Sequence, residues 1–358
     1  MKYLSTVIKG TGSYIPEYKI ENKDYVTNTF FEKDNSVIKG SGEEIVEKFK
    51  DITGIAERRW VKAHQTCSEI ATRAAKQAID SAEIDKETID HVIVATNFGD
   101  VIEGTIQTDL LPSLAARVKH NLGIEDPSCI AYDLIFGCPG WVQGVIQADS
   151  FIKTGLANRV LVIGAETLSR VVDVHDRDTM IFSDGAGAAI VEGVYTDQKS
   201  GVLSSATVTH TKDEAYYLYL GQSNKPGSDP NIRYVKMHGR KIYEYSLSNV
   251  PKAIKAAVDK SDIFVEDVKK VIIHQANEKM DAAIVQRFFK QYGIRVDVDE
   301  VMPMNIHELG NSSVATVPTL YDMILNGQIK NHKIDKGDII IFASVGAGMS
   351  INAIVYKQ

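Results

Sequence analysis

Apolar positions along the chain follow two spacings, and their alternation predicts an α/β protein. The stretch CSEIATRAAKQAIDSA at 67–82 places apolar residues every three to four positions, which is typical of a helix with one buried face. The stretch HVIVAT at 91–96 follows, a short run of β-branched residues typical of a buried strand. Runs of both kinds alternate along the chain, which favours a largely parallel sheet covered by helices.

The order of the predicted elements repeats. The first half leads through helices and strands to FGCPGW at 136–141, and the second leads through a similar order to GNSSVATVP at 310–318. The second series includes a strand-like run, VDEVMPMN, at 298–305. We therefore predict a pseudo-duplication with halves at 1–195 and 196–358.

The repeat places Cys138 and Asn311 in equivalent positions, each at a helix start that follows a strand. A helix start presents unpaired N–H groups and a partial positive charge, which lowers the pKa of a thiol. Each residue also has a simpler interpretation, because free cysteines are often small core residues and asparagine often only caps a helix. His274 ends the strand KVIIHQ, where α/β folds place functional side chains, although a structural histidine is equally compatible.

Together the three residues suit a condensation between thioesters. The cysteine takes an acyl group, and a malonyl-type thioester then loses carbon dioxide to give an enolate that attacks it. The histidine and asparagine can donate N–H groups to the enolate oxygen. The acyl carbonyl needs a separate oxyanion hole, for which the backbone N–H groups of Cys138 and of the turn SVGAGMS at 344–350 are suitable.

Composition narrows the class of protein. The formal net charge of −7 opposes broad nucleic-acid binding. No apolar stretch approaches the length of a membrane span, and the first residues lack the pattern of a signal peptide, so we expect no membrane insertion. The cysteines Cys67, Cys129 and Cys138 have neither metal-ligand spacing nor the pattern of a disulfide framework. We expect no metal site and a cytoplasmic location.

Motifs along nearly the whole chain resemble the β-ketoacyl-ACP synthase III family of the thiolase superfamily. They are GTGSYIPE from residue 10, TGIAERRW from 53, GCPGW from 137, IGAETLSR from 163, DRDTMIFSDGAGAAIV from 176, HQAN from 274, GNSSVATVP from 310 and the final glycine turn. The resemblance implies a thiolase-like, five-layered αβαβα fold and a homodimer. It also implies a catalytic set at Cys138, His274 and Asn311, with backbone N–H groups of Cys138 and Ala347 as the oxyanion hole.

The resemblance further implies substrates and a partner but no metal or redox cofactor. The primer would be an acyl-CoA or an acyl-ACP, and malonyl-ACP would be the extender. Relatives bind acyl carrier protein through basic residues, and the helix after HQAN offers Lys279, Arg287 and Lys290. A solvated helix surface explains these three equally well, and Glu244 weakens the basic patch.

Departures from the family concern the coenzyme A site. Lys48 and Ile52 stand where relatives commonly carry a tryptophan and an arginine that hold the adenine end. Arg170 does match a nucleotide-contacting arginine of relatives. The segment 98–113 is longer than its family equivalent and is expected near the acyl pocket and the dimer interface. A carrier-bound primer is therefore plausible.

We predict decarboxylative condensation in fatty acid, specialised lipid or polyketide biosynthesis. One alternative is acyl transfer without decarboxylation, although relatives of that kind tend to lack the asparagine. A degradative thiolase would need a second cysteine late in the chain, and none follows Cys138. Another alternative is a non-catalytic partner subunit of a ketosynthase heterodimer, although such subunits usually lose the nucleophile.

Overall fold

Hydrogen-bonded strands form the centre of the molecule. Within residues 2–102 and 104–358, which the computed structural model describes, nine strands are joined in the order β13-β14-β15-β10-β1-β9-β8-β4-β7. In that order they are Val268–Ile273, Ile339–Gly346, Ser350–Lys357, Gly201–Thr209, Tyr3–Tyr14, Asp184–Thr196, Arg159–Thr167, His91–Ala95 and Ile130–Leu134. Parallel and antiparallel pairs are mixed, so the expectation of a largely parallel sheet was only partly right.

The strand order contains the same run twice. In the first half β4 lies parallel to β8, which is antiparallel to β9, and β9 is antiparallel to β1. In the second half β13, β14, β15 and β10 repeat these relationships. The two runs touch through one parallel register pair, between Thr6 of β1 and Gly201 of β10. The boundary between halves near residue 195 remains a prediction.

The predicted strand at 298–305 was wrong. Val298–Val301 is a short helix, α7, and the residues after it are not a strand. The side chain of Gln275 bonds this segment instead: Nε2 donates to the carbonyl of Pro303 at 3.0 Å, and Oε1 accepts the N–H of Asn305 at 3.0 Å. One side chain thus pairs backbone groups that a strand ladder would otherwise pair.

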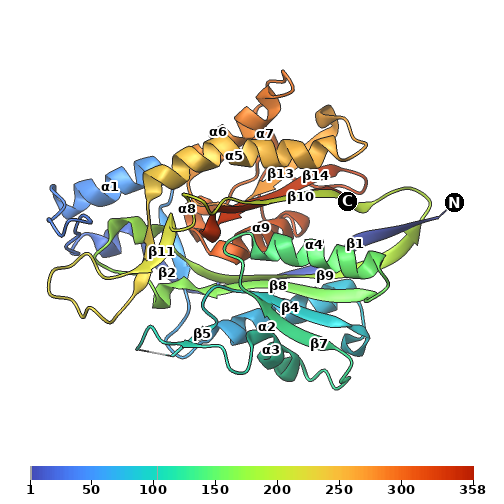
Figure 1. The fold of residues 1–358 in the computed structure, drawn as a ribbon, viewed down its shortest axis with the longest axis horizontal. Coiled ribbons are helices and arrows are strands. Elements are labelled where there is room, and N and C mark those ends of the chain that lie inside the picture. The colour runs from blue at the N-terminus through green and yellow to red at the C-terminus, as the bar shows by residue number, and fades with distance from the viewer. Residues whose placement is uncertain (1, 103) are drawn as a thin grey trace.

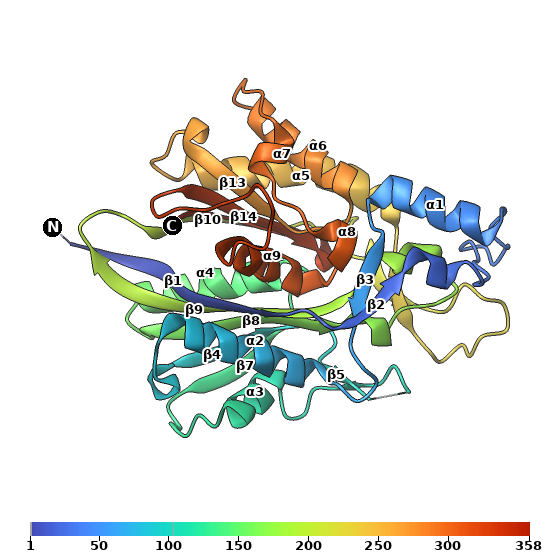
Figure 2. The same ribbon diagram turned by 180° about the vertical axis from the view of Figure 1, so that it is seen from behind.

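Helices and sheets alternate in five layers (Figures 1 and 2). Helices α5 (Gly239–Asp259) and α6 (Glu278–Lys290) lie outside the second-half strands, and α2 (Cys67–Ala82) and α3 (Leu114–Leu122) lie outside the first-half strands. Helices α4 (Gly140–Lys153) and α9 (Thr316–Leu325) lie between and contact both sets of strands. The predicted αβαβα arrangement is therefore confirmed.

Burial explains why the central helices differ from the outer ones. The middle core contains Trp141 and Val145 of α4, Leu320 of α9, and strand residues from both halves, such as Val162 and Phe342. A helix that is apolar on most faces requires packing on both sides, whereas α2 and α5 each bury one face.

Shorter elements surround one end of the layers. They are β2 (Tyr18–Glu21), β3 (Glu57–Trp60), β5 (Asp100–Val101), β6 (Thr108–Asp109), β11 (Leu218–Gly221), β12 (Tyr234–Met237), α1 (Gly42–Thr53) and α8 (Ile306–Leu309). Single 3₁₀ turns lie at Asn22–Tyr25, Lys86–Thr88, Leu168–Arg170, Arg177–Ile181, Val265–Asp267, Ser313–Ala315 and Ala347–Met349. In the described part of the chain, no helix is both long and apolar enough to cross a membrane.

A buried ion cluster fixes the hairpin β11–β12. Lys236 of β12 is 2% exposed, and its Nζ lies 2.6 Å from a carboxylate oxygen of Asp173 and 2.9 Å from one of Asp176. It also donates to the side-chain oxygen of Asn224 at 2.9 Å. Buried charges persist only when paired in this way, so the cluster is a structural anchor.

Candidate active site

The nucleophile candidate lies where two glycine-containing segments touch. Cys138 precedes Pro139, the N-cap of α4, and follows Gly137, whose φ is +75°. A Cβ added to Gly137 would lie 2.9 Å from the backbone nitrogen of Ala347, and one added to Gly346 would lie 2.5 Å from that of Cys138. Only glycines allow this approach, which brings the two predicted oxyanion-hole segments together.

The thiol of Cys138 is less acidic than its place at a helix start predicts. The residue is partly exposed, but protein surrounds its sulfur, and this burial raises the thiol pKa to about 11. A hydrogen bond from the hydroxyl of Ser313, at 3.2 Å, acts in the opposite direction. Loss of hydration outweighs the helix field, so the resting group is a neutral thiol.

His274 directly follows β13 and is held by hydrogen bonds. Its backbone N–H donates to the carbonyl of Ala343 at 2.8 Å, and its Nδ1 lies 2.7 Å from Oγ1 of Thr316. That hydroxyl donates to the carbonyl of Ser313 at 3.0 Å, so it accepts the hydrogen of Nδ1. Nε2 is then the ring nitrogen left for a substrate. Burial lowers the pKa of His274 to about 4, so the ring is neutral at pH 7.

Asn311 is fixed through both its backbone and its side chain. Its N–H donates to the carbonyl of Ile181, and its carbonyl accepts the N–H of Ser183, both at 2.9 Å. Its Oδ1 accepts the backbone N–H of Ser313 at 2.8 Å. Because the oxygen end of the amide is occupied, the donor Nδ2 is available to a ligand. Asn311 thus precedes the 3₁₀ turn Ser313–Ala315 and does not directly begin α9.

The turn 311–316 joins the three predicted residues. Ser313 contacts the sulfur of Cys138, binds Oδ1 of Asn311 through its N–H, and reaches His274 through Thr316. The structure therefore brings the predicted set together around one serine. The sequence analysis did not single out Ser313, because a serine in a polar turn carries no distinguishing pattern.

Two further residues behind the site were also missed. Asn97, which follows β4, donates from Nδ2 to Oγ of Ser313 at 3.1 Å and to Oε1 of Glu166 at 2.7 Å. Glu166 is fully buried on β8, and burial raises its pKa to about 8. The signal that could have identified Glu166 was a carboxyl group within the apolar run RVLVIGAET, because a buried ionisable residue often belongs to a functional site.

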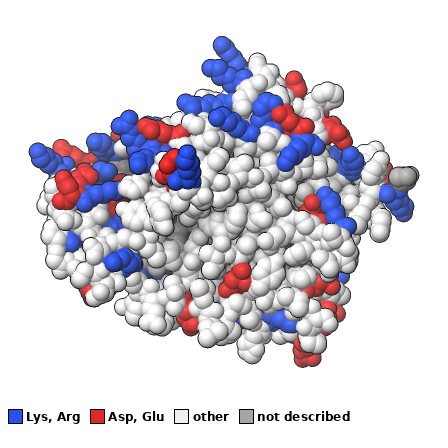
Figure 3. All heavy atoms as spheres, in the orientation of Figure 1, with Lys and Arg blue, Asp and Glu red and all other residues white. Residues whose placement is uncertain are grey.

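The predicted surface residues lie on the outer layer or at its end. Lys279, Arg287 and Lys290 are exposed on α6, and Figure 3 shows basic side chains, interspersed with acidic ones, along the edge where α5 and α6 lie. Arg170 is half-buried, and one of its guanidinium nitrogens donates to the carbonyls of Lys62, Ala63 and Gln65, at 2.7–3.2 Å. The contacts of these residues with coenzyme A and with a carrier protein remain predictions.

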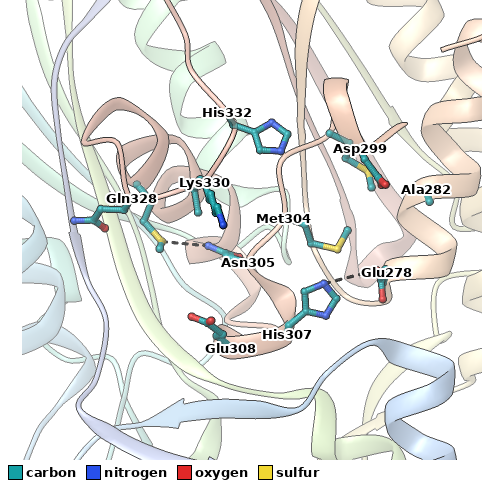
Figure 4. Close-up of a pocket in the computed structure, with 13 residues that line it drawn as sticks. Glu278, Ala282, Asp299, Met304, Asn305, His307, Glu308, Gln328, Lys330 and His332 are labelled. Carbon is teal, nitrogen blue, oxygen red and sulfur yellow. Dashed lines mark hydrogen bonds and ion pairs between the residues drawn. The ribbon is translucent and has the colours of Figure 1, made fainter. Parts of the chain in front are cut away.

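A cavity of about 420 Å³ lies beside the first turn of α6, and its lining contains none of the three predicted catalytic residues (Figure 4). Glu278 and His307 approach each other across it at 3.6 Å, and Asn305 donates to the sulfur of Met323 at 3.3 Å. Among the described residues, no group of three His, Cys, Asp or Glu side chains is arranged to hold a metal ion.

The fold resembles that of known enzymes. A solved 3-oxoacyl-[acyl-carrier-protein] synthase III from Aquifex aeolicus is 29% identical, with a TM-score of 0.78 over 99% of this chain and 100% of that one. A priming β-ketosynthase from a polyketide pathway is 25% identical, with a TM-score of 0.79 over 99% of this chain and 97% of that one. The chain has the thiolase fold and is a condensing acyltransferase.

The sequence comparisons define the family. Profiles for 3-oxoacyl-[acyl-carrier-protein] synthase III and for its C-terminal domain match residues 132–211 and 258–358. A β-ketoacyl-[acyl-carrier-protein] synthase III from Fusobacterium nucleatum is 33% identical over 356 residues, which cover 98% of each chain. The chain belongs to the β-ketoacyl-[acyl-carrier-protein] synthase III family.

Proposed function

We propose that this enzyme transfers an acyl group from a CoA or ACP thioester to Cys138 and condenses it with malonyl-ACP. The products are a 3-oxoacyl-ACP and carbon dioxide. The observation that carries this proposal is the turn 311–316, which contacts Cys138 and fixes both His274 and Asn311. The matches to named synthases III support the substrate class.

In the first step the sulfur of Cys138 attacks the thioester carbonyl. Backbone N–H groups of Cys138 and Ala347 stabilise the resulting oxyanion. Because Nδ1 of His274 already carries a hydrogen, Nε2 receives the proton of the thiol. The carbon–sulfur bond to the donor then breaks, and the departing CoA or carrier thiolate takes this proton from Nε2, which restores the neutral ring.

In the second step malonyl-ACP loses carbon dioxide and becomes an enolate. Nδ2 of Asn311 donates to its oxygen, and the negative charge favours uptake of a solvent proton at Nε2 of His274, which then donates to the same oxygen. The enolate carbon attacks the acyl carbonyl and releases the Cys138 thiolate, which recovers its proton from His274. The low pKa of His274 favours this return to the neutral ring.

Intact-protein mass tests the assignment directly. Wild type and Cys138→Ala would be incubated with acyl-CoA and acyl-ACP donors of several chain lengths, and malonyl-ACP would be added afterwards. We expect an acyl adduct in wild type alone and its conversion to 3-oxoacyl-ACP. Acyl transfer without release of carbon dioxide would favour the non-decarboxylating alternative, and the lack of any adduct would favour a non-catalytic subunit.

A carrier-bound primer fits the surface of α1 better than coenzyme A does. Lys48 and Ile52 are exposed on this helix, and Ile52 is 50% exposed. Neither side chain offers the aromatic face or the guanidinium group that the expected adenine contact would use. Arg170 remains a proposed nucleotide contact, and comparing acylation rates with CoA and ACP donors of one chain length would decide between the carriers.

Acyl carrier protein is proposed to bind α6 through Lys279, Arg287 and Lys290. Glu244, which weakened this prediction, forms an ion pair with Arg240 at 2.8 Å, so its charge is locally matched. Lys279→Glu with Lys290→Glu should raise KM for ACP substrates and leave that for CoA substrates unchanged. Lys199→Glu, in an exposed pair with Asp262, is the matched control. Equal effects of both changes would contradict the docking site.

A homodimer through β7 is also proposed. This strand ends the hydrogen-bonded series, and an open edge favours pairing with a second chain. Ile130 on β7 is 50% exposed, Ile135 is 62% exposed, and Leu111 of segment 98–113 is 89% exposed. Residue 103 of that segment lies outside the described residues. Light scattering at micromolar concentration would test the dimer, and a monomeric mass would contradict it.

The remaining expectations complete the proposal. The reaction needs only thioester substrates, with no metal or redox cofactor. A cytoplasmic location is proposed because Cys67, Cys129 and Cys138 are free thiols. The pathway is proposed to be fatty acid, specialised lipid or polyketide biosynthesis.

A further inference from the structure

The sulfur of Cys138 receives a hydrogen bond from a side chain that the proposed reaction has not used. The hydroxyl of Ser313 donates to Sγ at 3.2 Å. Ser313 is 3% exposed, and its φ of +53° lies in the left-handed region that serine rarely adopts. Because φ sets the direction of the Cα–Cβ bond, this unusual backbone is what places the hydroxyl beside the sulfur.

Asn97 fixes the direction of that hydroxyl. Its Nδ2 donates to Oγ of Ser313 at 3.1 Å, which occupies a lone pair of the oxygen. The single hydrogen of the hydroxyl is therefore free to point at the sulfur. A donor that also accepts a hydrogen bond is polarised and becomes a stronger donor.

Glu166 in turn holds Asn97. Its Oε1 accepts both the backbone N–H and the side-chain Nδ2 of Asn97. Glu166 is fully buried, and among the described residues its Oε2 has no hydrogen-bond partner. Burial raises its pKa to about 8, and the charge of Asp184 acts in the same direction. The carboxyl group is thus neutral at pH 7 and does not oppose negative charge on Cys138.

We infer that Glu166, Asn97 and Ser313 form a positioning chain for the nucleophile, in which Glu166 fixes Asn97, Asn97 orients Ser313, and Ser313 binds the sulfur of Cys138. This inference rests on the proposed role of Cys138 as the acylated residue. A hydroxyl binds a charged sulfur more strongly than a neutral one, so the chain favours the thiolate. This positioning chain begins with Glu166 on β8 and Asn97 after β4, and it ends with Ser313 in the turn 311–316 of the second half.

Alkylation of Cys138 by iodoacetamide across a range of pH tests the chain without any thioester. The thiolate displaces iodide, and the thiol proton goes to buffer, so the rate reports the fraction of thiolate. Peptide mapping separates Cys138 from the buried Cys67 and Cys129. Ser313→Ala should slow alkylation at pH 7 about tenfold and move the midpoint to higher pH. Ser312→Ala, the neighbouring serine, is the matched control and should retain the wild-type profile.

Further variants separate the members of the chain. Asn97→Ala should shift the midpoint in the same direction by less. Above pH 8 Glu166 is charged and opposes the thiolate, so Glu166→Gln should lower the midpoint while its amide oxygen keeps both bonds to Asn97. Glu166→Leu, which loses those bonds, should have a higher midpoint than Glu166→Gln. Ser313→Gly removes the hydroxyl and suits a positive φ, so it serves if the alanine variant does not fold. An unchanged profile in Asn97→Ala would remove Asn97 and Glu166 from the chain.

A wild-type profile in a folded Ser313→Ala or Ser313→Gly protein would overturn the inference. This result is distinct from failure of the proposed function. Absence of an acyl adduct in wild type with every donor would refute the proposed reaction, while the alkylation profiles would still decide whether Ser313 tunes the sulfur.

Discussion

The amide oxygen of Asn311 accepts the backbone N–H of Ser313 at 2.8 Å, so one end of this side chain is fixed before any substrate arrives. The other end, Nδ2, is consequently presented as a hydrogen-bond donor. An asparagine oriented in this way stabilises a developing oxyanion without reorganising during the reaction. The contribution of Nδ2 can therefore be measured with a substitution that keeps an oxygen facing the N–H of Ser313 and removes the donor at the other end of the side chain.

Asn311→Asp should lower the rate of condensation on the order of 100- to 1,000-fold, as expected for loss of one oxyanion donor. A carboxylate oxygen can still accept the N–H of Ser313, but the group facing the enolate no longer donates. Self-acylation should be affected far less, because it uses the other oxyanion hole. Quenched-flow measurement of both steps checks this, and an equal loss in both would contradict the assigned role.

Gly137→Ala should slow acylation about 100-fold, the effect of displacing reacting groups by roughly 1 Å. The added Cβ would lie 2.9 Å from the nitrogen of Ala347, which forces the oxyanion-hole segments apart. Gly155→Ala is the matched control, because φ is +74° at Gly155 and +75° at Gly137, but nothing lies within 4 Å of the added Cβ. Acylation rates that fall equally in both variants would show that only backbone strain matters.

Glu166→Gln should stabilise the protein in mildly alkaline solution. The folded-state pKa of Glu166 is raised by burial from 4.5 to about 8, so between these values the folded protein holds a proton that the unfolded chain has released. Stability of wild type therefore falls as pH rises through this window, by roughly 4 kcal/mol at pH 8. The free energy of unfolding, measured in urea at pH 5 and pH 8, should rise for the variant relative to wild type at pH 8. If the free energies of variant and wild type change equally between the two pH values, the raised pKa of Glu166 is refuted.

Lys236→Met should destabilise the fold by roughly 3 to 5 kcal/mol, the effect of removing one partner from a buried ion cluster. The carboxylates of Asp173 and Asp176 would remain buried without their cation. Lys199→Met, which breaks the exposed pair with Asp262, should leave the midpoint of chemical unfolding unchanged. Similar midpoints for both variants would show that the cluster contributes little.

Much of the fold could be predicted from the spacing of apolar residues and from motifs. The helix at 67–82 agrees with α2, and the strand at 91–96 agrees with β4 within one residue. The strand predicted at 298–305 failed because its pattern cannot reveal that Gln275, far along the chain, pairs with its backbone. Side-chain pairing of a backbone segment leaves no periodic signal.

The candidate site, like the fold, could be predicted only in part from the sequence. Predicted helix starts and strand ends pointed to Cys138, His274 and Asn311, although Asn311 precedes a 3₁₀ turn and does not begin α9 itself. Their protonation states depend on burial from every direction, which is why the thiol pKa rises where the local sequence predicted a fall. Ser313 and Asn97 escaped notice for a related reason, since each acquires its role only through contacts with the other half of the chain.

The single register pair between Thr6 and Gly201 means that the two strand runs are joined at a narrow seam. The sulfur belongs to one repeat, whereas the groups assigned to the enolate belong to the other. The proposed site is therefore assembled from both strand runs, and neither run carries all of its groups. A shift of one strand run against the other at this seam would change the distance between the sulfur of Cys138 and the groups proposed to bind the enolate.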